Sequence, residues 1–156
     1  MDAHYFTAYS YKKLLDGLPN AKLIDSERLV NWVRVVKSDA EIDLMKKASK
    51  ITELGMKKAF EFIKPGVRQN DLVAEIAGTL IKGTNEYGGD YSAIVPLLPT
   101  GKGTSASHLT WSDSKFVEGE ATIIELSGVY RRYHCPMART VPVSYTHLRA
   151  HETSLH

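Results

Sequence analysis

The sequence predicts an α+β domain in which two helices pack on an antiparallel sheet. Two amphipathic stretches come first, between residues 38 and 82, and two strand-like stretches follow within residues 121–140. Helices and strands that are grouped along the chain, rather than alternating, are typical of α+β proteins. The 156 residues give room for one domain with its own core, and 43% of them are hydrophobic.

Composition excludes several classes of protein. A net charge of +2 is too small to indicate a nucleic-acid partner or an anionic membrane. No apolar run approaches the ~20 residues that span a bilayer, and no signal peptide opens the chain. Cys135 is the only cysteine, so no internal disulfide can form, and we expect a cytoplasmic protein.

Two helices are predicted before the strands. Ser38 and Glu41 have the spacing of a capping box, which begins a helix that the Pro65-Gly66 pair ends. One face of this helix carries apolar or small residues at three- and four-residue spacing: Leu44, Ala48, Ile51, Gly55, Ala59 and Phe62. The second helix is predicted over about residues 70–82, with Gly83 as its stop.

Residues 121–140 are predicted to form two strands joined by a turn. The turn is expected at Ser127-Gly128, and the second strand begins at Val129. His134-Cys135-Pro136 is expected to end or bulge that strand, because proline cannot donate a hydrogen bond to a sheet.

Glu125 interrupts the apolar part of the first strand. A carboxylate in such a place costs free energy unless it is paired. One explanation is a salt bridge with a nearby arginine, of which the candidates are Arg131, Arg132 and Arg139. The other is a polar site at the mouth of the sheet.

The stretch before these strands, residues 84–116, is rich in Gly, Pro, Ser and Thr. Its apolar part, residues 93–98, contains Pro96 and is therefore expected to be an edge strand or a bulged one. His108 follows among small residues, which let a partner approach it, although a lone loop histidine is usually a surface residue.

Residues from about 35 to 141 resemble the catalytic domain of the pita-bread family, which includes aminopeptidase P, prolidase, creatinase and ectoine hydrolase. Residues 124–128, Ile-Glu-Leu-Ser-Gly, stand in place of the family's Ile-Asp-Leu-Gly, and residues 133–140 in place of its Tyr-x-x-Asp-x-x-Arg-Thr. Within the family, residues 86–91, 97–113 and 132–136 resemble ectoine hydrolase.

The resemblance implies an incomplete pita-bread domain. Residues 1–34 are similar to the last part of the family's N-terminal domain, and residues 35–143 to the first half of its catalytic domain. The tail, residues 144–156, resembles translated sequencing adapter and is set aside from fold prediction.

The resemblance also implies that the metal site is lost. Metallopeptidase members bind two metal ions through two aspartates, a histidine and two glutamates. Here Glu125 stands at the first aspartate position, and Pro136, which has no side-chain ligand, at the second. The other ligands would lie beyond the end of this chain, so we expect no metal and no other cofactor. A substitute site of His108 with His134 or Cys135 is the alternative, although adjacent strand residues point to opposite faces.

The implied activity is that of the metal-free branch, which hydrolyses C–N bonds of guanidino or cyclic amidine compounds. An amidinium carbon is already electrophilic, so the enzyme needs an acceptor for the cationic nitrogens and a base to activate water. His108, at the position of the family's catalytic histidine, is the expected catalytic residue. The expected substrate-binding residues are Glu125, Tyr133 and His134. The expected partner is a small molecule, ectoine or a related amidine.

Two other functions remain open from the sequence. One is a metal-dependent Xaa-Pro aminopeptidase or dipeptidase, and the other is a non-catalytic binding module on the same fold. We expect the full-length parent to be a homodimer, and this chain alone to be inactive and marginally folded.

Overall fold

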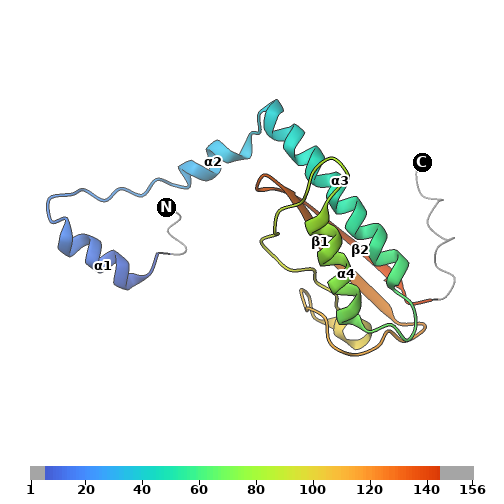
Figure 1. Ribbon diagram of the computed structural model, residues 1–156. Coiled ribbons are helices and arrows are strands. Elements are labelled where there is room, and N and C mark those ends of the chain that lie inside the picture. The colour runs from blue at the N-terminus through green and yellow to red at the C-terminus, as the bar shows by residue number, and fades with distance from the viewer. Residues whose placement is uncertain (1–5, 145–156) are drawn as a thin grey trace. The chain divides into compact units, whose positions relative to one another are not determined.

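The computed structural model describes residues 6–144, which fall into two compact units, Met1–Ser38 and Asp39–His156 (Figure 1). The first unit contains helices α1 (Ala8–Gly17) and α2 (Leu29–Val35). None of its described residues is buried, so this part of the chain has no core of its own. The domain boundary at residue 34 stays a prediction. The predicted adapter-like tail lies, apart from Ser144, outside the described residues.

Helices α3 (Asp39–Phe62) and α4 (Gln69–Lys82) confirm the two helices expected in the second unit. Four residues of the predicted stripe of α3 are buried (Ala48, Ile51, Gly55 and Ala59), and Leu44 and Phe62 are half-buried. Gly83 ends α4 with a positive φ of 70°, and its N–H donates to the carbonyl of Thr79. None of the described helices is long and apolar enough to cross a membrane.

Strands β1 (Ala121–Tyr130) and β2 (Tyr133–Pro142) form an antiparallel hairpin, which confirms the α+β class. The predicted turn at Ser127-Gly128 is wrong, because β1 runs through these residues. The chain turns instead at Arg131-Arg132, where both residues have a positive φ (48° and 71°). This two-residue loop has the backbone twist that joins neighbouring strands, although glycine or asparagine usually occupies it.

The predicted end or bulge at residues 134–136 is also wrong. These residues pair in regular register, with Pro136 opposite Ser127. In the described part of the chain β2 has β1 on one side only. An edge strand tolerates a proline, because no partner on its outer side requires the missing N–H.

Gly128 stays within β1 because helix α3 lies directly on it. A Cβ at this position would be 2.5 Å from the backbone nitrogen of Thr52 and 2.6 Å from the carbonyl oxygen of Ala48. The Thr52 hydroxyl lies between the strands, accepts from Gly128 N–H at 2.9 Å and contacts the carbonyl oxygen of Cys135 at 2.6 Å. One glycine and one hydroxyl therefore join α3 to both strands.

The predicted edge or bulged strand over residues 93–98 is reduced to one isolated bridge against β1, in which Leu97 pairs with Glu125. A second bridge, between Thr100 and Thr122, follows just after this segment. The chain then forms a short 3-10 helix, η2 (Gly101–Ser105). Pro96 removes one donor next to the first bridge, which is consistent with the loss of a continuous strand.

The two faces of the hairpin differ in their cover. Figure 1 shows α3 running along the hairpin with α4 beside it. The alternate β1 residues Thr122, Ile124, Leu126 and Gly128 are buried on the helix-covered face, here called the helix face. Glu125 and Ser127 point to the opposite face, here called the open face, and the register adds His134 and Pro136 to it.

Candidate functional site

A small pocket of about 150 Å³ lies on the open face of the hairpin. It is bounded by a loop segment on one side and by both strands on the other: Ala93, Ile94, Val95, Leu97, Glu125, Leu126, Ser127, His134 and Pro136. Glu125 is the only carboxylate among these residues. A single carboxylate within mostly apolar walls suits a small molecule that carries one positive charge.

The backbone of Glu125 is fixed on both sides. Its carbonyl accepts from Leu97 N–H at 2.8 Å, and its own N–H donates to the carbonyl of Leu97 at 3.1 Å. On the other side it pairs with Ala138 of β2. The carboxylate therefore extends from the middle of the sheet rather than from a flexible edge.

His108 lies next to this carboxylate. Leu98 N–H donates to the carbonyl of Leu109 at 3.0 Å, which holds the histidine loop beside the Leu97–Glu125 bridge. The Nε2 atom of His108 is 3.6 Å from Oε2 of Glu125, and the two side chains are 72% and 37% exposed. His108 also has a positive φ of 60°, a strained conformation that is concentrated at functional sites.

The arginine salt bridges considered for Glu125 are not formed among the described residues. The guanidinium of Arg132 lies 4.5 Å above the ring of Tyr91, and that of Arg131 lies 5.6 Å above Tyr130. Arg139 pairs with Ile124 and belongs to the helix face. The basic side chain within ion-pair distance of Glu125 in this part of the chain is His108, which is charged only when its ring is protonated.

His134 lines the same pocket, and both of its ring nitrogens have partners. Nε2 lies 3.1 Å from the backbone nitrogen of Ala93, and Nδ1 lies 3.1 Å from the carbonyl oxygen of Arg132. The structure thus brings together His108, Glu125 and His134 of the expected site residues.

Tyr133 is not brought to this pocket. Its hydroxyl donates to Oε1 of Glu41, in the first turn of α3, at 2.8 Å. The register places Tyr133 and Cys135 on the helix face, whereas His134 belongs to the open face. The substrate contact expected of Tyr133 stays a prediction.

The residues present do not fit a two-metal centre. Glu125 and Pro136, at the two aspartate positions of the metallopeptidases, line one pocket, but only Glu125 offers an oxygen ligand. Among residues 6–144, no three His, Cys, Asp or Glu side chains converge on a point where an ion would bind. His134 and Cys135 lie on opposite faces, so only one of them could share an ion with His108.

Sequence reasoning missed the apolar wall of the pocket. Ile94, Val95 and Leu97 belong to a run that was interpreted as a strand, and instead they line the space in front of Glu125. The available signal was Pro96, which separates two apolar pairs and prevents regular pairing there.

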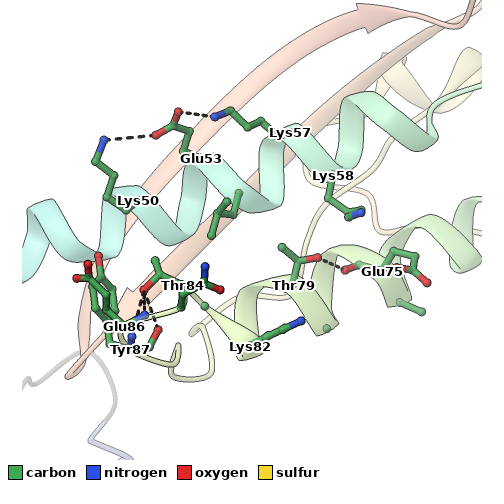
Figure 2. A pocket seen from close by; sticks show the side chains of 15 residues that line it. Lys50, Glu53, Lys57, Lys58, Glu75, Thr79, Lys82, Thr84, Glu86 and Tyr87 are labelled. Carbon is green, nitrogen blue, oxygen red and sulfur yellow. Dashed lines mark hydrogen bonds and ion pairs between the residues drawn. The ribbon is translucent and has the colours of Figure 1, made fainter.

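A larger groove of about 930 Å³ lies between α3, α4 and residues 83–87. Figure 2 shows Glu53 between Lys50 and Lys57, with an ion pair to each. The hydrogen bond and the charge of Lys57 hold the pKa of Glu53 below its usual range. Its threonines bond to main-chain atoms of the same helix or loop, such as Thr79 to the carbonyl of Glu75. The groove is therefore large, but the contacts of its described residues do not bring a pair of reactive side chains together in it.

Comparison with known proteins identifies the family of the chain that forms this pocket. The sequence profile described as metallopeptidase family M24 matches residues 43–156. The chain belongs to metallopeptidase family M24. Among solved structures of this fold, the X-Pro aminopeptidase of Thermotoga maritima superposes with a TM-score of 0.80 at 20% identity, covering 90% of this chain and 38% of that one. The prolidase of Pyrococcus furiosus gives a TM-score of 0.79 at 21% identity, covering 89% and 40%.

A more similar M24 relative is the ectoine hydrolase of Halomonas elongata, which is 49% identical over 146 residues. The Xaa-Pro aminopeptidase of Escherichia coli is 27% identical over 124 residues. The first alignment covers 90% of this chain and 37% of the relative, and the second covers 80% and 27%. The chain thus spans well under half the length of the M24 proteins that it matches. These comparisons confirm the predicted partial pita-bread fold.

Proposed function

We propose that this chain is the segment of a longer M24 hydrolase that supplies part of the active site of a metal-independent ectoine hydrolase. The observation that carries the proposal is that His108 lies 3.6 Å from Glu125, a residue that lines a small, mostly apolar pocket. The 49% identity to the Halomonas ectoine hydrolase supports the substrate, and Pro136 at an aspartate position supports the absence of a two-metal centre.

The chemistry follows from these two side chains. Ectoine is a cyclic amidine, so its protonated ring carries a delocalised positive charge that the Glu125 carboxylate can hold. A pocket of about 150 Å³ with apolar walls accommodates a single small ring. The charge makes the amidine carbon electrophilic, so water can attack it once a base has accepted a proton.

The reaction needs one proton relay. The oxygen of water forms a bond to the amidine carbon while His108 accepts a proton from it. The ring C–N bond then breaks, and the proton moves from His108 to the departing nitrogen. The second proton of the water leaves the new hydroxyl group for the released amine, which gives an amide carbonyl and an ammonium group. The product is an acetylated diaminobutyrate, and no oxidant or reductant is consumed. The imidazole suits this exchange because histidine gains and loses protons near neutral pH.

The proposal carries three further expectations. Tyr133 contacts the substrate only if the complete protein brings it toward the pocket, whereas His134 already lines it. The full-length enzyme is homodimeric, as many M24 enzymes are. It is cytoplasmic, as the single cysteine suggests.

The test uses the full-length enzyme that contains this segment. Incubation with ectoine, followed by proton NMR, should show ring opening to the acetylated product, and elemental analysis of the active protein should find no stoichiometric metal. Cleavage of Xaa-Pro dipeptides with no turnover of ectoine would instead establish the metal-dependent peptidase.

His108→Asn separates an enzyme from a binding module. Asparagine tolerates the left-handed backbone at this position but cannot relay a proton. We expect kcat on ectoine to fall by about 100-fold or more with ectoine binding largely retained. Ectoine binding by the unsubstituted protein without any turnover would favour the binding module.

A further inference from the structure

The turn of the hairpin is strained, and its neighbours hold it in place. Both Arg131 and Arg132 have the left-handed backbone conformation that side chains with a Cβ disfavour. Such strain persists only where surrounding contacts fix it, so those contacts indicate what the turn is for.

Arg132 and the adjoining end of β1 contact one loop, residues 90–91. The N–H of Arg132 donates to Oδ2 of Asp90 at 3.2 Å, and its guanidinium lies 4.5 Å above the ring of Tyr91. The N–H of Asp90 donates to the carbonyl of Val129 at 2.9 Å. The end of the hairpin therefore contacts the loop at Asp90 and Tyr91, just before the pocket wall begins.

His134 also connects the turn to this loop, and its two hydrogen-bond partners define its tautomer. The carbonyl of Arg132 can only accept, so Nδ1 of His134 must carry the hydrogen. The backbone N–H of Ala93 can only donate, so Nε2 must present its lone pair. Only the neutral Nδ1–H tautomer makes both hydrogen bonds.

Ala93 is the first residue of the pocket wall. The far end of the wall, Leu97, is fixed by its two hydrogen bonds to Glu125. Between these ends, Ile94 and Val95 are 62% and 51% exposed, so little packing holds them. The distance of the wall from Glu125 thus depends on the hydrogen bonds at its two ends, which are the His134–Ala93 bond and the Leu97–Glu125 bonds.

We propose that His134 is a positioning residue that sets the apolar wall of the Glu125 pocket through Ala93, and thereby determines how tightly a small cyclic cation is held. This role rests on the proposed function for the identity of the ligand. It differs from the substrate contact expected of His134, because both ring nitrogens are used by the protein itself.

Two substitutions in the full-length enzyme separate the two hydrogen bonds of His134, to Ala93 and to Arg132. His134→Asn retains a donor near the Nδ1 position for Arg132 but offers no acceptor to Ala93. His134→Gln places an amide oxygen near the Nε2 position, where it can accept from Ala93. We expect His134→Asn to raise KM for ectoine by about 10-fold with kcat within about twofold, and His134→Gln to restore KM to within about threefold. Equal KM values for the two variants, or a loss confined to kcat, would overturn the proposal.

A measurement without substrate keeps this result distinct from the proposed function. Hydrogen exchange of a peptide covering residues 91–97 should be slow in the unsubstituted enzyme and in His134→Gln, and faster in His134→Asn. The ¹⁵N shifts of the His134 ring should report the Nδ1–H tautomer. Faster exchange in His134→Asn without ectoine turnover in any variant would leave the positioning role standing and remove ectoine as the ligand. Unchanged exchange, or the opposite tautomer, refutes the positioning role whatever the substrate.

Discussion

The two faces of one hairpin carry different tasks. On the helix face, Leu126 and Gly128 pack under α3, and the Thr52 hydroxyl completes the hydrogen bonding of the strands. On the open face, Glu125 and His134 line a small pocket. Successive residues of a strand point to opposite faces, so the chain alternates between the two tasks at every residue.

This alternation lets side chains on one face change without disturbing the other. Glu125 and Pro136 both lie on the open face, where α3 and α4 do not pack. A substitution at either position therefore leaves the packing of the helix face untouched.

The strongest test of the comparison uses neighbouring residues. Leu126→Ala removes a side chain that is 3% exposed, so we expect the free energy of unfolding to fall by roughly 2–5 kcal/mol. Glu125→Gln, one residue earlier, should leave that free energy nearly unchanged and lower kcat on ectoine by about 100-fold. Urea unfolding and kinetics of the full-length enzyme measure both. Similar stability losses in the two variants would contradict the division between the faces.

Gly128→Ala tests the helix face without a change of polarity. The new methyl group would meet backbone atoms of Thr52 and Ala48 at 2.5 and 2.6 Å, and backbone cannot move aside cheaply. We expect a loss of roughly 3 kcal/mol in the free energy of unfolding. Gly119→Ser is a matched control, since no atom lies within 4 Å of a Cβ there, although its φ of 84° still costs some backbone strain. A loss at Gly128 no larger than that at Gly119 would contradict the importance of the close approach of α3.

Thr52→Val removes the hydroxyl that joins the strands while keeping the shape of the side chain. It removes the hydrogen-bond partner that Gly128 N–H and the carbonyl of Cys135 have on α3, and we expect a loss of roughly 2 kcal/mol. Thr52→Ser retains the hydroxyl and should lose less. The same urea titration decides, and a Ser variant less stable than the Val variant would show that the methyl packing matters more than the hydrogen bonds.

The sequence predicted those features that depend on local periodicity. The α3 and α4 helices followed from apolar spacing and stop signals, and the family resemblance correctly indicated the partial M24 fold. The turn was misplaced because Gly128 was interpreted as a turn residue. Glycine is required at position 128 because the backbone of α3, which is distant in sequence, lies directly against it.

The site was predictable only in part, for the same reason. His108 and Glu125 were both expected to act, but their contact depends on the pairing of Leu97 with β1 and of Leu98 with Leu109. No residue pattern within one segment reports such pairing. The hydrogen bond between His134 and Ala93 likewise joins strand β2 to a loop that is distant in sequence, and no spacing rule applies to it.

A charge pair outside both faces gives the smallest expected effect. Arg68 donates two hydrogen bonds to Asp71 at the start of α4, at 2.8 and 3.1 Å, and these bonds hold the pKa of the Asp71 carboxyl below its usual range. A lowered native pKa means that ionised Asp71 stabilises the fold above about pH 4, and that this contribution disappears as the pH falls through the native pKa. Asp71→Asn should therefore lower the thermal midpoint slightly at pH 7, and the difference should vanish in acid and shrink in high salt, because the pair is exposed. A difference that persists in acid would assign the effect to the geometry of the helix start. If the difference vanishes, the charge of Asp71 accounts for this small effect on stability. The charge of Glu125, by contrast, is expected to affect kcat and not stability.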